Sequence, residues 1–386
     1  MRTRLRPVVA TVAFAAVLVA LSAAALELRV RRPLRLPDVP GFLTLQCDLH
    51  THTVFSDGQV WPDTRSEEAW REGFDAIAIT DHVEYLPHRR DLPPSLERSW
   101  EIAAPLGEKL GLIVIRGSEV TRKMPPGHLN ALFLREVCPL ETPEWRDALR
   151  AAKAQGAFVV WNHPAWRGHQ KDGLARWYSE HDELLREGLL DAIEVVNDRV
   201  YSPEAHRWAI EKGLAIVAGS DVHDPSGLSW HVHEGDHRPV TLVFARERSE
   251  RAIHEALLAR RTAAVSGDTL IGSAELLRPL VSAALTVENA RIAIRAGADA
   301  YLRVRNDSGL RFELVGPGGA GDLAAPRNAV VAANGTSLLE VSVPKGSAPG
   351  RRRVELAYSV TNAKVTPEEG LDVTLSVDLE VLPPAK

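Results

Sequence analysis

Cysteine is nearly absent from this sequence: among 386 residues there are two, Cys47 and Cys138. Two cysteines allow at most one disulfide bridge, which excludes the cross-linked framework of small secreted domains. Neither cysteine belongs to a Cys-x-x-Cys pair, so a zinc site built from thiolates is not expected.

Positive charge is not in excess either. The chain has 46 lysines and arginines against 51 aspartates and glutamates, and its formal net charge is -5. This balance predicts no extended basic surface for a nucleic acid. The 45% hydrophobic and 25% charged content is that of an ordinary globular chain, long enough for two domains.

Charged side chains are missing from residues 8–26, a run that follows three arginines. A basic start, an apolar stretch and small residues at 22–25 are typical of an export signal. The run is also close to the roughly 20 residues that span a bilayer, so an uncleaved anchor fits equally. We therefore predict a signal peptide or N-terminal membrane anchor at 1–26 and a periplasmic or extracellular location.

A proline-rich linker is expected at 27–44, followed by an α/β domain at 45–270. Short apolar runs in this domain alternate with helical patterns such as SPEAHRWAIEKG, in which Ser202 and Pro203 suit a helix start. This alternation predicts parallel strands with crossover helices, in a barrel or a wound sheet. The seven predicted strands are 46–49, 75–79, 112–115, 129–134, 157–161, 192–196 and 215–218.

Histidine is absent after His254, and the pattern of apolar and polar residues changes at about residue 280. Segments such as RVELAYSV and DVTLSVDLEVLP alternate apolar and polar residues and are separated by Gly, Pro, Asn and Asp. Residues 281–386 are therefore predicted to form a small all-β, sandwich-like domain. This domain carries no recognisable chemistry, so it could serve as a packing lid, an oligomer contact or a wall-binding module.

Metal-ligand residue types stand at nearly every strand end of the α/β domain. Loops at the carboxyl ends of barrel strands are where such folds build active sites. In an extended His-x-His, both imidazoles point to one face, so His50 and His52 can bind one ion together. Imidazole and carboxylate suit Zn, Mn and Fe, and nine candidates fit two or three ions rather than one. The candidates are His50, His52, Asp57, His82, Glu119, His128, His163, Asp221 and His223.

The motifs HTH…SDG, ITDH, GSE, GH, NHP and GSDVH, in this order, resemble those of the PHP (polymerase and histidinol phosphatase) superfamily of metal-dependent phosphoesterases. The resemblance implies a distorted seven-stranded (β/α)7 barrel that holds two or three divalent transition metals, Zn, Mn or Fe. It also implies three ligand groups: His50, His52, Glu119 and Asp221; Asp57, His82 and His223; and Glu119, His128 and His163.

The implied reaction is hydrolysis of a small phosphate ester, a phosphodiester or a phosphomonoester. A hydroxide between two metals would attack phosphorus, with Asp57, His82, Glu119 and His223 as the catalytic residues. The stretches TDHVEYLPHRRD and AFVVWNHPAW further resemble an exported bacterial branch with phosphodiesterase members.

Substrate-binding residues are predicted from their place after the strand ends. Arg167 and Arg199 are candidates to clamp phosphate oxygens, although a solvated arginine explains each equally well. His88 and Arg89 are further candidates to line the pocket. The loop that follows His223 carries Trp230, His231, His233 and His237 and suggests a lid, while Trp166 could stack on an aromatic leaving group or fill space at the barrel rim.

Two other functions fit parts of the pattern. A metal-dependent amidohydrolase would also use His-x-His and Asp, but it is expected to carry a bridging lysine where this chain has Glu119. An exported, non-catalytic scaffold would hold metal for stability and bind a surface through its β-domain. Metal-dependent turnover of a generic phosphodiester separates the three hypotheses.

Overall fold

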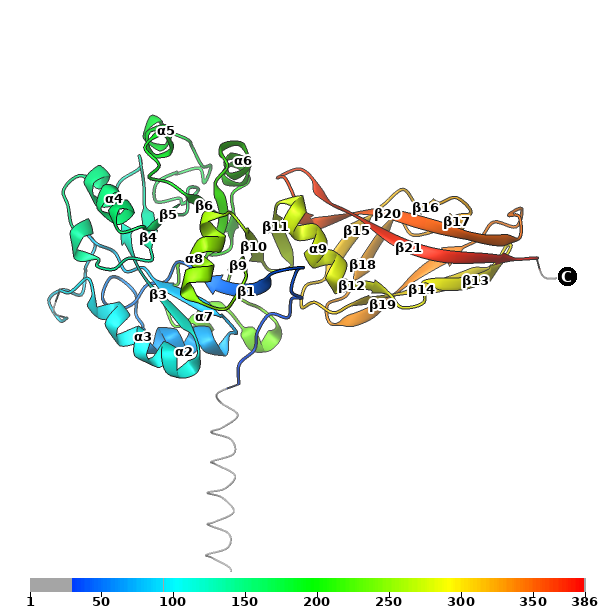
Figure 1. Ribbon diagram of the computed structural model, residues 1–386, viewed down its shortest axis with the longest axis horizontal. Helices are drawn as coiled ribbons and strands as arrows, with labels where there is room; N and C mark the ends of the chain where they lie inside the picture. The colour runs from blue at the N-terminus through cyan, green and yellow to red at the C-terminus, as the bar shows by residue number, and fades with distance from the viewer. Residues whose placement is uncertain (1–29, 93, 385–386) are drawn as a thin grey trace, which may run out of the picture.

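The computed structural model describes residues 30–92 and 94–384. The predicted signal or anchor, residues 1–26, lies outside the described residues. None of the helices within the described ranges is long and apolar enough to cross a membrane. The described chain forms an α/β part and an elongated β part, placed end to end with helix α9 at their junction (Figure 1).

The α/β part contains all seven predicted strands, each within a few residues of its expected position. Their bounds are β1 Leu43–Asp48, β2 Ala76–Ile79, β3 Ile113–Val120, β4 Leu129–Leu132, β5 Phe158–Trp161, β6 Ala192–Asn197 and β8 Ala215–Gly219. Four more strands join them: β7 Val200–Tyr201, β9 Val240–Ala245, β10 Thr262–Ser266 and β11 Thr269–Gly272.

The expected parallel (β/α)7 arrangement needs correction, because the sheet is mixed. The pairs β1–β2, β2–β3, β5–β6 and β6–β8 are parallel, but β4 runs antiparallel to both β3 and β5. The loop from β3 to β4, residues 121–128, is too short for a crossover, which explains this reversal. Strand β9 pairs antiparallel with β1, and β10 and β11 continue the sheet beyond it.

Helices cover this sheet as the alternating pattern predicts. Helix α6 begins where expected: the Ser202 hydroxyl accepts a hydrogen bond from the Ala205 amide at 3.2 Å, and Pro203 is its first residue. The α-helices are α2 Pro62–Arg71, α3 Arg98–Leu110, α4 Trp145–Ala154, α5 Ser179–Arg186, α6 Pro203–Lys212, α7 Ser226–Ser229, α8 Glu250–Leu258 and α9 Ala274–Ala284, with 3₁₀ turns at η1 Cys138–Leu140 and η2 Val232–Glu234.

The C-terminal part is the predicted all-β domain. One sheet has the order β12-β14-β19-β17-β16, and the other contains β13, β21 and β20 with β15 and β18. Buried and exposed residues alternate along the long strands, as expected for two sheets around one core. The bounds are β12 Leu285–Val287, β13 Arg291–Arg295, β14 Asp299–Asn306, β15 Phe312–Val315, β16 Gly319–Ala320, β17 Leu323–Ala324, β18 Asn328–Val331, β19 Gly335–Ser342, β20 Gly350–Lys364 and β21 Gly370–Leu382.

The two parts are joined more closely than the sequence suggests. Strand β11 pairs in parallel with β20, so that Leu270 lies opposite Ala363 and one sheet continues across the junction. One hydrophobic core also includes residues of α2, β9, α9 and both β-sheets. In the predicted linker, Arg31 pairs with Asp75 at 2.9 Å and the Arg35 carbonyl accepts from the Gly309 amide at 2.7 Å. Cys47 is buried, Cys138 is exposed, and the two do not form a bridge.

Candidate metal centre

The nine candidate ligands come together at one edge of the α/β sheet. His50, His52, His82, His163, Asp221 and His223 follow the ends of β1, β2, β5 and β8, and Glu119 lies near the end of β3. His128 precedes β4 and reaches the same edge, because β4 is antiparallel and begins where its neighbours end. The reversal that corrects the fold prediction therefore places this histidine in the site.

The ligand atoms form three overlapping groups, within each of which all of the atoms lie within 4.8 Å of one another. Two residues belong to two groups each, His52 and Glu119. Of the nine side chains, His50, His52, His82, Glu119 and His163 are buried. The groups are His52, Asp57, His82 and His223; His50, His52, Glu119 and Asp221; and Glu119, His128 and His163.

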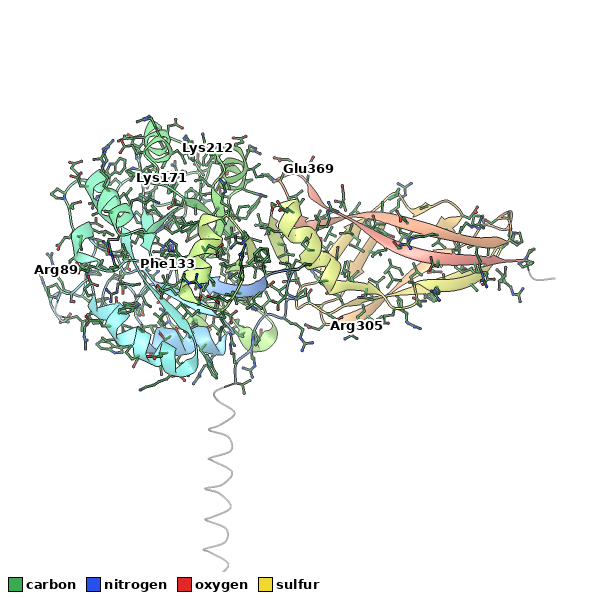
Figure 2. The ribbon with its side chains drawn as sticks, in the orientation of Figure 1. Arg89, Phe133, Lys171, Lys212, Arg305 and Glu369 are labelled. Atoms are coloured by element: carbon green, nitrogen blue, oxygen red, sulfur yellow. The ribbon has the colours of Figure 1, made fainter. Side chains whose placement is uncertain are left out.

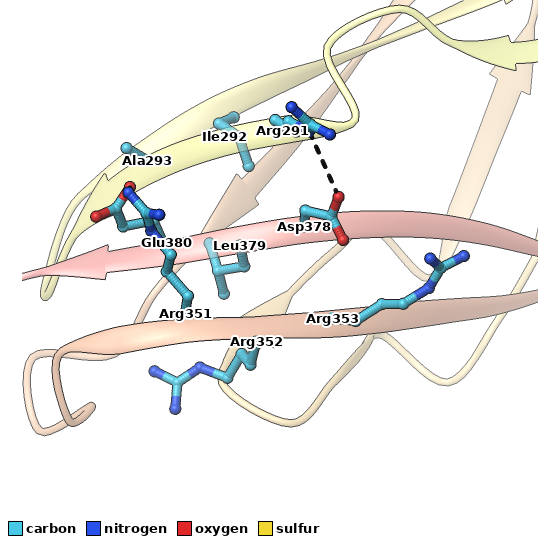
Figure 3. Close-up of a pocket in the computed structure, with 9 residues that line it drawn as sticks. All are labelled: Arg291, Ile292, Ala293, Arg351, Arg352, Arg353, Asp378, Leu379 and Glu380. Atoms are coloured by element: carbon cyan, nitrogen blue, oxygen red, sulfur yellow. Dashed lines mark hydrogen bonds and ion pairs between the residues drawn. The ribbon is translucent and has the colours of Figure 1, made fainter.

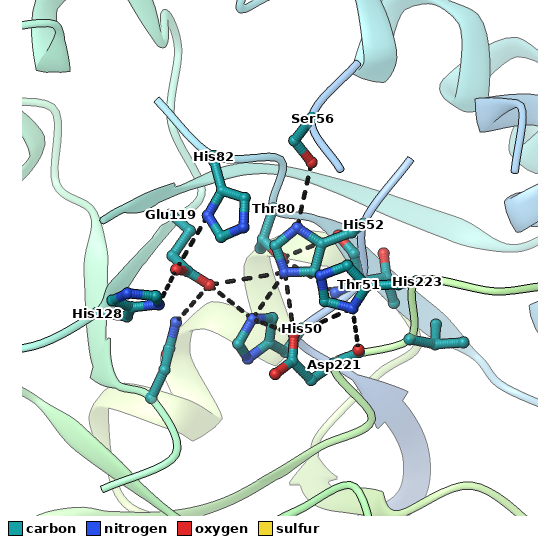
Figure 4. A network of polar contacts seen from close by, with 12 residues as sticks. His50, Thr51, His52, Ser56, Thr80, His82, Glu119, His128, Asp221 and His223 are labelled. Carbon is teal, nitrogen blue, oxygen red and sulfur yellow. Dashed lines mark hydrogen bonds and ion pairs between the residues drawn. The ribbon is translucent and has the colours of Figure 1, made fainter. Parts of the chain in front are cut away.

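The group around His50 is the most crowded (Figure 4). His50 Nε2 lies 2.8 Å from Glu119 Oε2, 3.1 Å from His52 Nε2 and 3.2 Å from Asp221 Oδ1. His52 Nε2 lies 3.1 Å from the same Asp221 oxygen. Several lone pairs converge on one point, and a positive charge there, either a proton or a metal ion, stabilises the arrangement.

The second group surrounds Asp57. Its Oδ1 atom lies 3.1 Å from His223 Nε2 and 3.3 Å from His82 Nε2. This buried oxygen has no partner with the geometry of a hydrogen bond. An oxygen that faces two imidazole nitrogens without bonding either is arranged as a ligand around a shared centre, and this donor set suits a divalent transition metal.

The third group has Glu119 at its centre. Glu119 Oε1 lies 2.6 Å from His128 Nδ1, and the other oxygen, Oε2, faces His50. The two oxygens of this one carboxylate therefore face different groups, the arrangement that a bridging ligand needs. His128 Nδ1 approaches Glu119 without the geometry of a hydrogen bond, and the buried His163 Nδ1 has no hydrogen-bond partner. Both atoms again fit a metal rather than a structural role.

The electrostatics keep Glu119 ionised and two of the buried histidines, His52 and His163, uncharged. Burial disfavours an ionised carboxylate, yet the imidazoles of His82 and His128 hold the pKa of Glu119 well below its usual range. Burial, together with the neighbouring His82, lowers the pKa of His52 to about 4. Burial also lowers the pKa of His163 to about 3. Near neutral pH, these two imidazoles are therefore uncharged lone-pair donors.

Hydrogen bonds behind the ligands determine which ring nitrogen faces the centre. The His50 Nδ1–H donates to Glu194 Oε1 at 2.8 Å, and the His223 Nδ1–H donates to the Asp221 carbonyl at 2.7 Å. Since a carboxylate and a carbonyl can only accept, each ring carries its proton on Nδ1 and presents Nε2 to the cluster.

The loop that carries Asp57 is anchored by Asp81, the residue before His82. Asp81 accepts hydrogen bonds from the Thr53 amide and hydroxyl, both at 2.7 Å, and from the Ser56 hydroxyl at 2.6 Å. A Cβ atom at Gly58 would come within 2.8 Å of the backbone of His52, so this turn needs glycine. The backbone is also strained at two candidate ligands, because φ is 30° at His163 and 54° at Asp221.

A fully buried arginine ties two ligand loops together from behind. Arg65 of α2 donates from Nε to the His52 carbonyl at 3.2 Å and from Nη2 to the His223 carbonyl at 3.1 Å. Its Nη1 donates to the Asp224 carbonyl at 3.1 Å and to Glu68 Oε2 at 2.6 Å. One guanidinium therefore sets the spacing between the loops of His52 and His223.

Sequence reasoning missed Asp81, Glu194 and Arg65, as well as His169. The ring of His169 lies 4.8 Å from that of His128. Asp81 and His169 lie within or next to quoted motifs, and Glu194 is an acid inside an apolar run, which is a usable signal. Arg65 gives no such signal, because its role depends entirely on contacts between distant segments.

The predicted substrate residues lie in different places. Arg167 lines a cavity of about 550 Å³ beside the cluster. Arg199 instead pairs with Asp236 and donates to the Ser229 carbonyl, both at 2.8 Å. His88 and Arg89 lie in a turn and line neither this cavity nor the one over the ligands, and Arg89 lies at the outer edge of the α/β part (Figure 2).

The predicted lid is partly anchored. Trp230 is buried, and the Arg199 guanidinium lies 5.8 Å from its ring centre. His231 is exposed, and the two ring nitrogens of His237 contact the carbonyls of Arg238 and Gly267 at 2.7 and 3.1 Å. The backbone of His233 lies in η2.

A separate hollow of about 650 Å³ lies on the C-terminal domain, among arginines of β13 and β20 (Figure 3). Carboxylates of β21 lie between them: Asp378 is 3.8 Å from Arg291, and Glu380 is 3.1 Å from Arg351. These are exposed cross-strand pairs of a solvated sheet face, and the hollow contains none of the candidate ligands.

Comparison with known proteins agrees with this architecture. An Ig-like domain family model matches residues 285–376. The chain superposes with a TM-score of 0.84 on a two-domain protein from Bacteroides vulgatus that contains a predicted PHP-like metal-dependent phosphoesterase. The two sequences are 39% identical, and the match covers 90% of this chain and 99% of that one. This chain also aligns over 208 residues, at 29% identity, with an error-prone DNA polymerase of Nocardia farcinica; the match covers 53% of this chain and 16% of the polymerase.

Proposed function

Because this chain belongs to the family of two-domain proteins with a PHP-like metal-dependent phosphoesterase domain, we propose that it hydrolyses phosphate esters with divalent metal ions. The observation that carries the proposal is the set of three overlapping ligand groups, in which Glu119 belongs to two groups and its oxygens face different neighbours. This donor set is rich in imidazole and carboxylate, which suits Zn, Mn or Fe.

We assign one ion to each group, which makes the centre trinuclear. When bound, the ions would acidify a water molecule and neutralise negative charge on the phosphoryl oxygens. More than one metal equivalent per chain is expected after reconstitution. Glu119→Gln should lower the occupancy of two positions together, because one carboxylate serves both. Elemental analysis that finds at most one equivalent contradicts this arrangement.

The chain's own residues hold the candidate ligands in place around a small cavity in which a phosphoryl group would bind. A cavity of about 190 Å³ lies over the ligands and is lined by Asp57, His82, Glu119, His128 and His163, among others. In this cavity Asp57 supplies the negative charge of its group. His82 is held in place by the Thr121 hydroxyl, 2.6 Å from Nδ1, which turns Nε2 toward Asp57. His223 is oriented by the Asp221 carbonyl.

The site favours phosphate esters over amides for a specific reason. A metal-dependent amidohydrolase of the type considered above is expected to bridge its ions with a lysine. No lysine is among the described residues that line the 190 Å³ cavity, and Glu119 lies at the shared position. A carboxylate at this place adds negative charge and so increases the affinity for several cations.

The test is turnover by the full chain after chelation and reconstitution with Mn or Zn. Bis(p-nitrophenyl) phosphate, p-nitrophenyl phosphate and p-nitroacetanilide distinguish diester, monoester and amide hydrolysis. We expect metal-dependent release of p-nitrophenol from a phosphate ester, loss of it in Asp221→Asn, and normal turnover in the surface control Asp378→Asn. Hydrolysis of the anilide alone would indicate the amidohydrolase, and metal-dependent stabilisation without any turnover would indicate the scaffold.

A further inference from the structure

The larger cavity beside the ligands has no role in the chemistry described so far. It has a volume of about 550 Å³ and shares four lining residues with the 190 Å³ cavity: His163, Trp166, Asp221 and His223. A phosphoryl group in the small cavity therefore places the rest of an ester against the same wall residues, and the larger cavity is the adjoining space.

Two exposed apolar side chains line this larger cavity. Trp166 is 48% exposed and Val200 is 54% exposed, and both line it. The Trp166 ring is held against histidines, with ring centres 4.8 Å from His169 and 5.4 Å from His163. The indole is therefore fixed in orientation, while about half of its surface stays open, and a rigid aromatic surface of this kind suits a stacking partner.

Hydrogen-bond acceptors complete the lining. Asp198 adopts a left-handed conformation, with φ of 49°, and its amide donates to the Gly219 carbonyl at 3.1 Å. Its carboxylate makes no hydrogen bond or ion pair with another described residue. The neighbouring Asn197 uses its amide nitrogen on Glu194 Oε2 at 2.9 Å, which leaves its carbonyl oxygen free to accept. These groups suit hydroxyl or N–H donors on the bound molecule.

We propose, on the basis of the proposed function, that the 550 Å³ cavity binds the organic group of the ester and selects a flat ring system that carries hydrogen-bond donors. Trp166 supplies the stacking surface, Val200 the second apolar contact, and Asp198 the acceptor. A second anionic group is disfavoured beside Asp198, and Arg167 is the one arginine or lysine among the described residues that line the cavity.

Two matched pairs of compounds test the selection. Benzyl phosphate and cyclohexylmethyl phosphate have similar leaving groups but differ in the flatness of the ring, and the corresponding benzyl- and cyclohexylmethylphosphonates are not hydrolysed. Binding of the phosphonates to the metal-reconstituted full chain is measured by calorimetry. Aromatic stacking on Trp166 should make the benzyl compound bind up to about tenfold more tightly.

Variants assign this preference to the cavity. Trp166→Leu should reduce the ratio of the affinities for benzylphosphonate and cyclohexylmethylphosphonate to about one. The control Trp145→Leu, at a half-buried position of α4, should keep the wild-type ratio. Because Trp166 also contacts His163, a second variant is needed. Val200→Asp lies on an exposed two-residue strand and should lower the binding of benzylphosphonate several-fold relative to methylphosphonate, because it places a carboxylate beside the ring.

The outcomes separate the two proposals. Equal binding of the two ring phosphonates to the wild type overturns the subsite, as does an unchanged ratio in both variants. If both phosphate esters are hydrolysed with equal kcat/KM and the phosphonates bind equally, the subsite fails and the proposed function stands. If the benzyl preference is present and depends on Trp166 but no ester is hydrolysed, the subsite stands and the proposed function fails.

Discussion

Glu194→Gln probes how the chain orients its ligands, because it changes one atom of a buried side chain. Glu194 Oε1 accepts from His50 Nδ1 at 2.8 Å, and Oε2 accepts from the His163 amide at 2.7 Å and from the Asn197 side chain at 2.9 Å. A glutamine keeps the volume but has one acceptor. That oxygen is expected to stay with the two fixed donors, which turns the new NH₂ group toward His50 Nδ1.

The consequence is a change of tautomer. An NH₂ group cannot accept the Nδ1 proton, so His50 would carry its proton on Nε2, the atom that lies among the ligand atoms. A protonated Nε2 has no lone pair for a metal. Loss of such an outer hydrogen bond typically lowers metal affinity by about 10- to 100-fold, which corresponds to about 1.4–2.8 kcal/mol.

The effect on folding should be smaller than the effect on metal binding. Burial raises the pKa of Glu194, which shows that the carboxylate is held at a cost that a neutral amide avoids. We therefore expect the free energy of unfolding of the metal-free chain to change by about 1 kcal/mol or less. Metal affinity and stability should respond differently, which a general packing defect would not produce.

The assay is competition for metal with a chelator of known affinity, together with urea unfolding of the metal-free chain. The matched control is Glu183→Gln, the same substitution at a surface ion pair with Arg146. Turnover of bis(p-nitrophenyl) phosphate by Glu194→Gln should recover in part at high metal concentration. A folded Glu194→Gln protein that binds metal within about twofold of the wild type would refute the tautomer argument.

Four further predictions follow from other parts of the structure. Asp57→Asn keeps the turn and removes the charge, so kcat should fall by at least about 100-fold at little cost in stability. Near-normal turnover would show that Asp57 only shapes the turn. Arg65→Met breaks a buried network and should cost about 3–5 kcal/mol of unfolding free energy in urea; a loss below about 1 kcal/mol would contradict its role between the loops. Burial lowers the pKa of His181 to about 4; since its unfolded pKa is about 6.5, the stability from the neutral form is complete above pH 6.5 and is lost as pH falls toward 4. The wild type should lose about 2 kcal/mol more than His181→Gln between pH 7.5 and pH 5, and equal losses would refute the assignment. A reporter fused after Pro40 should be active outside the cytoplasm, and activity confined to the cytoplasm would refute export.

Local pattern was enough to predict the strands of the α/β part and their polar ends. An apolar run such as 192–196 must be buried, and its length and β-branched content favour a strand. The period of two also places His50 and His52 on one face without any tertiary information. The alternation in the last third of the chain predicted two β-sheets for the same reason, and the Ig-like match agrees with it.

The tertiary structure decided what depends on segments that are distant in sequence. The direction of β4 was not readable from its four residues, although this direction brings His128 to the ligand edge. The pairing of β11 with β20, which joins the two domains, depends on residues more than 90 positions apart. Arg65 and Glu194 acquire their roles through carbonyls and ring nitrogens supplied by other strands and loops. The sequence by itself determined which residue types stand at the strand ends, because side-chain chemistry and strand period are local. Folding decided which ligands are shared and how each imidazole is oriented, because hydrogen bonds to distant backbone and side-chain atoms exist only in the assembled structure.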